Sequence, residues 1–168
     1  MRKLLCCAGL VMLFLPLTAV AQDSPKAEIF TGYSYLRSEG VNAHGFNGSI
    51  AGNINKNFGV VADLGVYRAS ESGESGTAVT YLFGPRISGR SDKVDPFFHV
   101  LFGGARVSAV GESDHAFAFA IGGGLDIKAS NSVAIRVAQI DYLGSRFGGE
   151  TQSNFRFSVG IVFRIGKR

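Results

Sequence analysis

Apolar and polar residues alternate along most of the chain, and the segment 155–165 shows this pattern most clearly. In "FRFSVGIVFRI" every second residue from Phe155 to Ile165 is apolar, whereas the positions between them include Arg156 and Arg164. Successive side chains of a β-strand point to opposite faces, so this period of two predicts a strand with one apolar and one polar face. A soluble sandwich and a transmembrane barrel both contain such strands, so one segment does not separate the two folds.

The N-terminus has the pattern of a secretory signal peptide. A basic start is followed by an apolar stretch that ends in the small residues Ala-Val-Ala, directly before Gln22. This order is typical of a cleaved export signal. We therefore predict a signal peptide over residues 1–21 and one domain over residues 22–168. The alternative is an N-terminal membrane anchor, which Pro16 disfavours because it interrupts the apolar run.

Composition excludes several classes of function for the mature chain. Both cysteines, Cys6 and Cys7, lie in the predicted signal, so no thiol nucleophile, disulfide or cysteine-bound metal is expected. Without Arg2 and Lys3, 15 basic residues stand against 13 acidic ones, and a net charge of +2 does not favour a nucleic-acid partner. Beyond the signal no apolar run approaches the about 20 residues of a membrane-spanning helix, so a mature chain in a membrane would cross it as strands.

The alternation recurs in eight segments separated by Gly, Asn, Ser and Asp. Each has about the 9–11 residues that a tilted strand needs to cross a bilayer, and soluble strands are usually shorter, at about 5–6 residues. We therefore predict an all-β fold, an eight-stranded antiparallel up-and-down transmembrane β-barrel. Its expected strands are Glu28–Arg37, Gly45–Asn55, Phe58–Tyr67, Thr77–Arg86, Phe97–Val107, His115–Ile127, Ser132–Tyr142 and Asn154–Ile165.

The connections fall into two length classes. Tight turns are expected at 55–57 and 128–131, and longer, polar, Gly- and Ser-rich loops at 38–44, 68–76, 108–114 and 143–153. Short turns at one rim and long loops at the other are typical of outer-membrane barrels. The segment Ile87–Pro96 is long for a turn, but the alternation places it at the short-turn, periplasmic rim.

The two faces of the predicted strands differ in character. One face is small or polar, with residues such as Asn47, Asp63, Thr80, Ala118 and Asp126. An eight-stranded barrel has an interior just wide enough for side chains to fill, so this face is predicted to line the lumen. The other face is predicted to contact lipid, through Phe46, Ile50, Ile54, Phe58, Val60, Ala62, Leu64, Val66, Val79, Tyr81, Phe83, Phe117, Phe119, Ile121, Leu125 and Ile127.

Charged residues of the inward face predict a network of ion pairs inside the barrel. A lone buried charge is costly, and arginine offers a planar set of donors that suits carboxylates. The predicted members are Glu28, Asp63, Arg86, Asp126, Arg136 and Arg156, with Arg164 as a further candidate. The alternative is that some of them lie at the rims and are solvated.

The orientation of two strands stays open at this point. In the fifth strand, an inward Arg106 would also bring Phe98 and Phe102 into the lumen. In the seventh strand, an inward Arg136 conflicts in phase with Gln139 and Asp141 unless a β-bulge intervenes.

Several segments in order resemble a known family. "EIFTGYSYLR", "GNINKNFGVVADL", "FFHVLFGGAR" and "FRFSVGIVFRIGKR" are similar to the consensus of porin-like, OmpA-type outer-membrane β-barrel proteins, and the resemblance covers nearly all of Glu28–Arg168. It implies a monomeric barrel in the Gram-negative outer membrane, in contact with lipid and lipopolysaccharide and inserted by the barrel-insertion machinery.

The chain departs from that family in two respects. It ends in "FRIGKR" rather than on an aromatic residue, so recognition by the insertion machinery would use Phe163 or Ile165. It also has no Trp, so an interfacial girdle would consist of phenylalanines and the five tyrosines, Tyr33, Tyr35, Tyr67, Tyr81 and Tyr142.

Reactive chemistry has little support in the sequence. His44, His99 and His115 lack metal-ligand spacing, and Glu112–His115 holds triad residue types whose adjacency does not give triad geometry. We therefore predict no catalytic, metal or cofactor site. The leading hypothesis is a structural, adhesion or loop-display barrel with a filled lumen, and the alternatives are a small low-conductance pore or, less favoured, a lipid-modifying enzyme.

Overall fold

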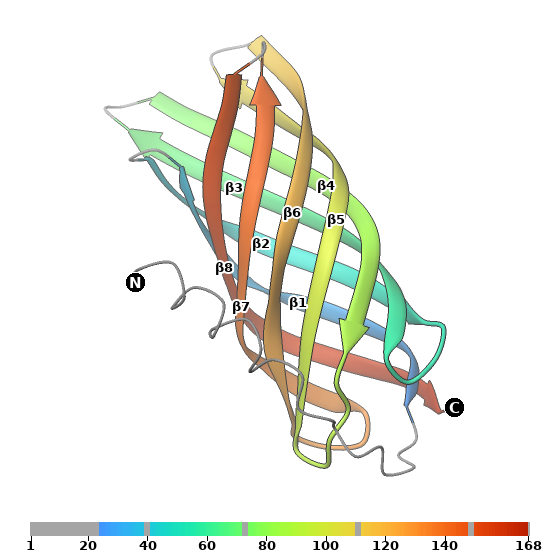
Figure 1. Cartoon of the computed structure of the whole chain (residues 1–168). Coiled ribbons are helices and arrows are strands. Elements are labelled where there is room, and N and C mark those ends of the chain that lie inside the picture. Colours follow the sequence, from blue (N-terminus) through green and yellow to red (C-terminus); the bar gives the residue numbers. More distant parts are fainter. Residues whose placement is uncertain (1–23, 39–40, 72–73, 110–111, 148–149, 168) are drawn as a thin grey trace, which may run out of the picture.

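The chain folds into a closed barrel of eight antiparallel strands (Figure 1). The computed structural model describes residues 24–167 except 39–40, 72–73, 110–111 and 148–149. The predicted signal peptide, residues 1–21, lies outside the described residues. Each strand pairs with its neighbours in sequence, and β1 also pairs with β8, which confirms the predicted topology. The strands are β1 (Pro25–Ser38), β2 (Val41–Asn53), β3 (Phe58–Glu71), β4 (Glu74–Ser88), β5 (Val94–Ala109), β6 (Glu112–Lys128), β7 (Val133–Phe147) and β8 (Glu150–Lys167).

The described residues contain no helix that is long and apolar enough to cross a membrane.

At one rim the strands run further than predicted. Ser38 pairs with Val41, Glu71 with Glu74, Ala109 with Glu112 and Phe147 with Glu150, so most residues of the four predicted long loops belong to strands. The prediction of long loops was wrong because backbone hydrogen bonds between strands do not require an apolar face. Polar Ser, Thr and Asn positions therefore continue the antiparallel pairing.

The opposite rim carries the two ends of the barrel and three short connections. Pro25 pairs with Lys167 there, beside the connections 54–57, 89–93 and 129–132. In the first of these, the Asn55 side chain accepts hydrogen bonds from the backbone N–H groups of Asn57 and Phe58, at 2.9 and 2.8 Å. Such side-chain acceptors favour tight turns. The predicted turn Ile87–Pro96 is also at this rim, but β4 and β5 leave only 89–93 outside the strands.

The exposure of the side chains confirms the assignment of the two faces. On β3, Leu64 is 54 % exposed and the adjacent Asp63 only 4 %. On β6, Ile121 is 42 % exposed, whereas Asp126 is fully buried. An apolar surface therefore surrounds the barrel, and the small and polar positions point inward.

The structure also gives the orientation of β5 and β7. Phe98, Phe102 and Arg106 all point outward. On β7 a register shift lies between Arg136 and Gln139, where two residues oppose Val159 of β8. This bulge resolves the conflict in phase, because Arg136, Gln139 and Asp141 are all buried.

The half of the interior remote from the termini is mainly apolar. The buried side chains there include Leu36, Leu82, Leu101, Leu143 and Tyr67. Tyr67 is only 1 % exposed, so its predicted place in an interfacial girdle was wrong. Its ring lies over Gly65, where an added Cβ would come within 2.5 Å of the Tyr67 hydroxyl. The absence of a side chain at this position therefore allows the ring to lie inside the barrel.

Candidate functional site

Buried charges fill the half of the lumen that lies toward the termini. Among the described residues, five carboxylates and five arginines contact one another there, and we call them the lumen charge network. Eight are nearly fully buried strand residues, Arg164 is slightly more exposed, and Arg90 belongs to the 89–93 connection. The members are Glu28, Asp63, Arg86, Arg90, Asp95, Asp126, Arg136, Asp141, Arg156 and Arg164.

Arg156 of β8 connects opposite walls of the barrel. Its Nη1 donates to Asp63 Oδ1 of β3 at 2.7 Å, and its Nε donates to Asp141 Oδ2 of β7 at 2.7 Å. The Asn47 side chain donates to the other oxygen of Asp63 at 3.0 Å. Arg156 is fully buried, so two carboxylates from different strands balance its charge.

The bulge in β7 brings a second arginine into the same network. Arg136 forms a two-point pair with Asp126, with Nε–Oδ1 at 2.7 Å and Nη2–Oδ2 at 3.0 Å. Its Nη1 donates to the Gln139 side-chain oxygen at 2.7 Å, and the Gln139 amide donates to Asp141 at 2.7 Å. Gln139 therefore links the pair of Arg136 to the pair of Arg156.

Two guanidinium groups share an aromatic neighbour. Arg86 lies 3.3 Å from Glu28 and 3.4 Å from Asp126. The guanidinium carbons of Arg86 and Arg136 lie 4.3 and 4.2 Å from the centre of the inward-facing Phe97 ring. An aromatic face attracts cations, and Asp126 contacts both arginines. Phe97 and Asp126 therefore reduce the repulsion between Arg86 and Arg136.

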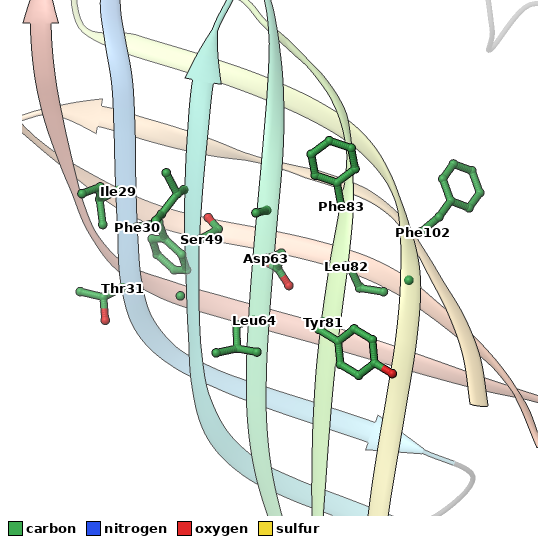
Figure 2. A pocket seen from close by; sticks show the side chains of 14 residues that line it. Ile29, Phe30, Thr31, Ser49, Asp63, Leu64, Tyr81, Leu82, Phe83 and Phe102 are labelled. Carbon is green, nitrogen blue, oxygen red and sulfur yellow. The ribbon is translucent and has the colours of Figure 1, made fainter. Parts of the chain in front are cut away.

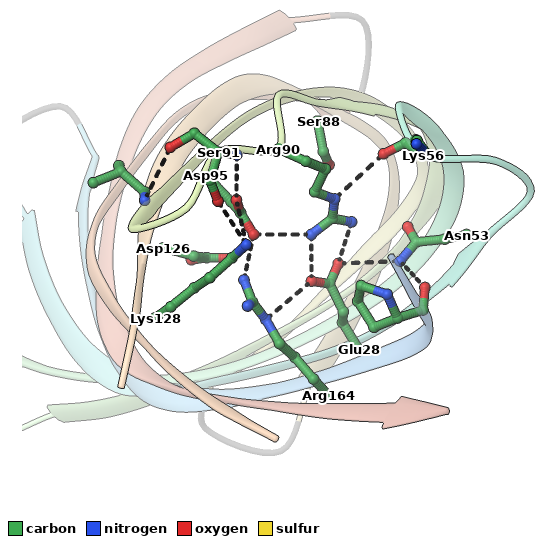
Figure 3. Close-up of polar contacts among 12 residues, drawn as sticks. Glu28, Asn53, Lys56, Ser88, Arg90, Ser91, Asp95, Asp126, Lys128 and Arg164 are labelled. Carbon is green, nitrogen blue, oxygen red and sulfur yellow. Dashed lines mark hydrogen bonds and ion pairs between the residues drawn. The ribbon is translucent and has the colours of Figure 1, made fainter. Parts of the chain in front are cut away.

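The network continues to the mouth of the barrel beside the termini (Figure 3). Arg90 reaches from the 89–93 connection to both oxygens of Glu28, at 2.8 and 3.1 Å, and to Asp95 at 3.3 Å. Burial alone would lower the pKa of Arg90, but its hydrogen bonds with Glu28 and Asp95 and their charges raise it. Arg164 pairs with Asp95, and Lys128 lies 3.6 Å from the same carboxylate.

All six residues predicted for the lumen lie in this network, and Arg164 belongs to it as well. Sequence reasoning missed Arg90, Asp95, Asp141 and His99. Arg90 and Asp95 fell in the predicted turn Ile87–Pro96. The alternation of a strand does not apply to a turn, so it could not predict whether their side chains point inward. The alternation predicted that Asp141 and Arg136 point to opposite faces of β7. The bulge between Arg136 and Gln139 brings both side chains into the lumen.

The three histidines lie on different faces of the barrel wall. His99 Nε2 lies 2.8 Å from Asp141 Oδ1 inside the network, whereas His44 and His115 are exposed on the outside. In the part of the chain that the structure describes, no three His, Cys, Asp or Glu side chains are grouped to hold a metal ion.

An apolar groove of about 660 Å³ crosses the outside of β1–β5 (Figure 2). Ile50, Leu64, Tyr81, Phe83 and Phe102 line it with outward-facing side chains. The Asp63 carboxylate, although it belongs to a lining residue, bonds Arg156 in the lumen. Apart from the hydroxyl groups of Thr31 and Tyr81, the outward-facing side chains of the groove are apolar, which suits contact with a lipid acyl chain.

Comparison with known proteins finds a shared fold. No family model matches the sequence, and no curated protein matches it. Neisserial surface protein A is similar in structure, with a TM-score of 0.65, 14 % identity and coverage of 83 % of this chain and 96 % of that one. The N-terminal barrel domain of Pseudomonas aeruginosa OprF gives 0.58 at 11 % identity, covering 84 % and 98 %. Ail of Yersinia pestis gives 0.51 at 21 % identity, covering 83 % and 99 %. The chain therefore has the fold of the small outer-membrane β-barrels.

Proposed function

We propose that this protein is a monomeric, non-enzymatic barrel of the Gram-negative outer membrane, with a closed lumen and a structural or adhesive role. The observation that carries the proposal is the filled interior within an apolar exterior. A chain with an export signal reaches the outer membrane from the periplasm, and an even number of strands leaves both ends of the barrel on one side. The rim with the termini and the connections 54–57, 89–93 and 129–132 therefore faces the periplasm, and the opposite rim faces the cell exterior.

The lumen contents argue against a conducting pore. At the periplasmic end, an ion would have to separate carboxylates and arginines that already neutralise one another at 2.7–3.4 Å. Toward the exterior it would meet Leu36, Tyr67, Leu82, Leu101 and Leu143, which are all buried. Removing the hydration shell of an ion without replacing it is expensive, so both layers oppose conduction.

The outer rim favours the adhesive form of the role. Paired strand ends extend there as far as Ser38, Glu71, Ala109 and Phe147, so this rim is built of hydrogen-bonded strands. Among the proteins with the same fold, Ail is the attachment invasion locus protein of Yersinia pestis, and one of its structures is a complex with the heparin analogue sucrose octasulfate. A small pore and a lipid-modifying enzyme are the alternative functions.

Planar-bilayer recording of the refolded protein tests the closed lumen. We expect conductance indistinguishable from that of the bilayer alone, with a porin of known conductance recorded under the same conditions as the positive control. A stable open channel in the unmodified protein would contradict the closed lumen and favour the small pore.

Export and insertion belong to the same proposal. The signal peptide is removed after Ala21, and the insertion machinery recognises the apolar face of β8, including Phe163 and Ile165, which are 44 % and 51 % exposed. The mass of the protein from outer membranes should correspond to a chain that begins at Gln22. An uncleaved chain would indicate the membrane anchor instead.

A further inference from the structure

Among the side chains that the structure describes on the outside of the barrel wall, the charged ones are all basic and lie near one rim. Among the outward-facing strand positions whose side chains the structure describes, none is a carboxylate. The arginines and histidines there are exposed, and we call them the basic rim: Arg37, His44, Arg68, Arg106, His115 and Arg146. They come from six of the eight strands, β1, β2, β3, β5, β6 and β7.

The strand register makes several of these residues neighbours. His44 of β2 lies directly opposite Arg68 of β3, and Arg106 of β5 lies directly opposite His115 of β6. Arg146 of β7 pairs with the residue two positions beyond His115, on the same face. Directly opposite residues in antiparallel strands have neighbouring side chains. The basic rim therefore consists of neighbouring basic residues on β2–β3 and on β5–β7, together with Arg37 of β1, at the end remote from the termini.

An interfacial layer lies directly below the basic rim. The Tyr33 hydroxyl bonds His44, the Tyr35 hydroxyl donates to Asn42 at 2.6 Å, and the Tyr142 hydroxyl lies 2.8 Å from Ser153. Each tyrosine thus has its apolar ring toward the apolar surface around the middle of the barrel, which we call the apolar belt, and its hydroxyl group toward the rim. Aromatic residues with this placement mark the boundary between the hydrocarbon and the head groups. The basic rim therefore lies at the height of the lipid head groups.

Three arginines of this rim, Arg37, Arg68 and Arg146, differ from those of the lumen. Among the described residues, no ion pair joins Arg37, Arg68 or Arg146 to a carboxylate, whereas each arginine in the lumen contacts at least one. The planar guanidinium group binds phosphate with two parallel hydrogen bonds. These three arginines are exposed at head-group height, and no carboxylate that the structure describes lies on the same face, so they match an anionic head group in charge and position.

We propose that the basic rim binds the phosphate groups of lipopolysaccharide in the outer leaflet. This inference rests on the proposed function, because that function directs the rim toward the cell exterior. The neighbouring apolar belt and the groove across β1–β5 contact the acyl chains of the same lipid. The rim thereby holds the barrel at a fixed depth and surrounds it with phosphorylated lipid.

Titration of the protein in detergent micelles with lipid A that carries both phosphates tests the proposal, with dephosphorylated lipid A as the ligand control. The variant Arg37→Gln/Arg68→Gln/Arg146→Gln removes three charges of the basic rim. Its matched control, Lys26→Gln/Lys56→Gln/Lys93→Gln, removes three exposed charges at the opposite end. We expect the rim variant to lose roughly 100-fold in affinity for phosphorylated lipid A, because each arginine near an anionic surface contributes measurably to binding. The control variant should bind like the wild type.

Three outcomes would overturn the proposal. Equal binding by the rim variant and the wild type would show that these arginines are not involved. Equal binding of phosphorylated and dephosphorylated lipid A would assign recognition to the acyl chains alone. Tighter binding of soluble sucrose octasulfate than of lipid A would indicate a sulfated glycan as the ligand. If the wild type folds in micelles but does not bind lipid A, only this inference is refuted. If the wild type does not fold in micelles, the proposed function is refuted as well.

Discussion

Replacement of Asp126 by alanine tests whether the lumen charge network stabilises the barrel. The fully buried Asp126 carboxylate accepts hydrogen bonds from Arg136 at 2.7 and 3.0 Å and lies 3.4 Å from Arg86. Loss of one partner of a buried ion pair costs about 3–5 kcal/mol, because the remaining charge stays buried without its counter-charge. Arg86 keeps Glu28 at 3.3 Å and Arg136 keeps Gln139 at 2.7 Å. We therefore expect the lower end of this range, a loss of about 3 kcal/mol in the free energy of unfolding.

Urea unfolding of the barrel in phospholipid vesicles, followed by circular dichroism, measures this loss. The matched control is Asp92→Asn in the 89–93 connection, where the carboxylate is exposed and the expected change is below about 1 kcal/mol. The double variant Asp126→Ala/Arg136→Ala should be less destabilised than the sum of the single variants, by about 1–3 kcal/mol. A loss below about 1 kcal/mol for Asp126→Ala, with additive effects, would refute the reasoning, because it would mean that water replaces the carboxylate at little cost.

Three further predictions concern the two faces and the membrane assignment. Arginine in place of Leu64 or Ile121 should reduce the stability in vesicles by about 2–4 kcal/mol, whereas Thr77→Arg at the rim should cost at most about 1 kcal/mol; similar costs at all three positions would contradict the assigned depth. Gly65→Ala should destabilise the barrel by about 1–3 kcal/mol in urea unfolding, because the new Cβ meets the Tyr67 ring, and unchanged stability would show that the ring moves away freely. The mature protein should fractionate with outer membranes and migrate differently on gels before and after boiling, and purification as a soluble monomer without detergent would exclude the membrane assignment.

The number of strands and the two faces were predictable because a closed barrel offers each strand residue only two environments. Asp63 and Leu64 illustrate this: one is buried in the lumen and the other exposed, as the period of two requires. Inward and outward side chains alternate in this way wherever a strand contains no bulge. The sequence therefore sufficed to place all six predicted lumen charges on strands, five of them without ambiguity.

The remaining features depend on interactions that the alternation does not encode. The bulge in β7 puts Arg136 and Asp141 on the same side, although their spacing predicts opposite sides for an unbroken strand. Arg90 enters the lumen from a turn, where no period applies. The extent of the strands at the outer rim follows from backbone pairing, which polar residues also satisfy, so the loops were predicted to be too long.

The contacts of β8 have a consequence for assembly. This strand supplies both Arg156 and Arg164, which reach Asp63 of β3, Asp95 of β5 and Asp141 of β7. In a sheet of the first seven strands Asp95 would keep Arg90 and Lys128, but Asp63 and Asp141 would lack an arginine partner. An isolated buried charge is costly. The joining of β8 to β1 closes the hydrogen-bonded seam and neutralises the interior in the same event. Partly closed sheets are thereby disfavoured.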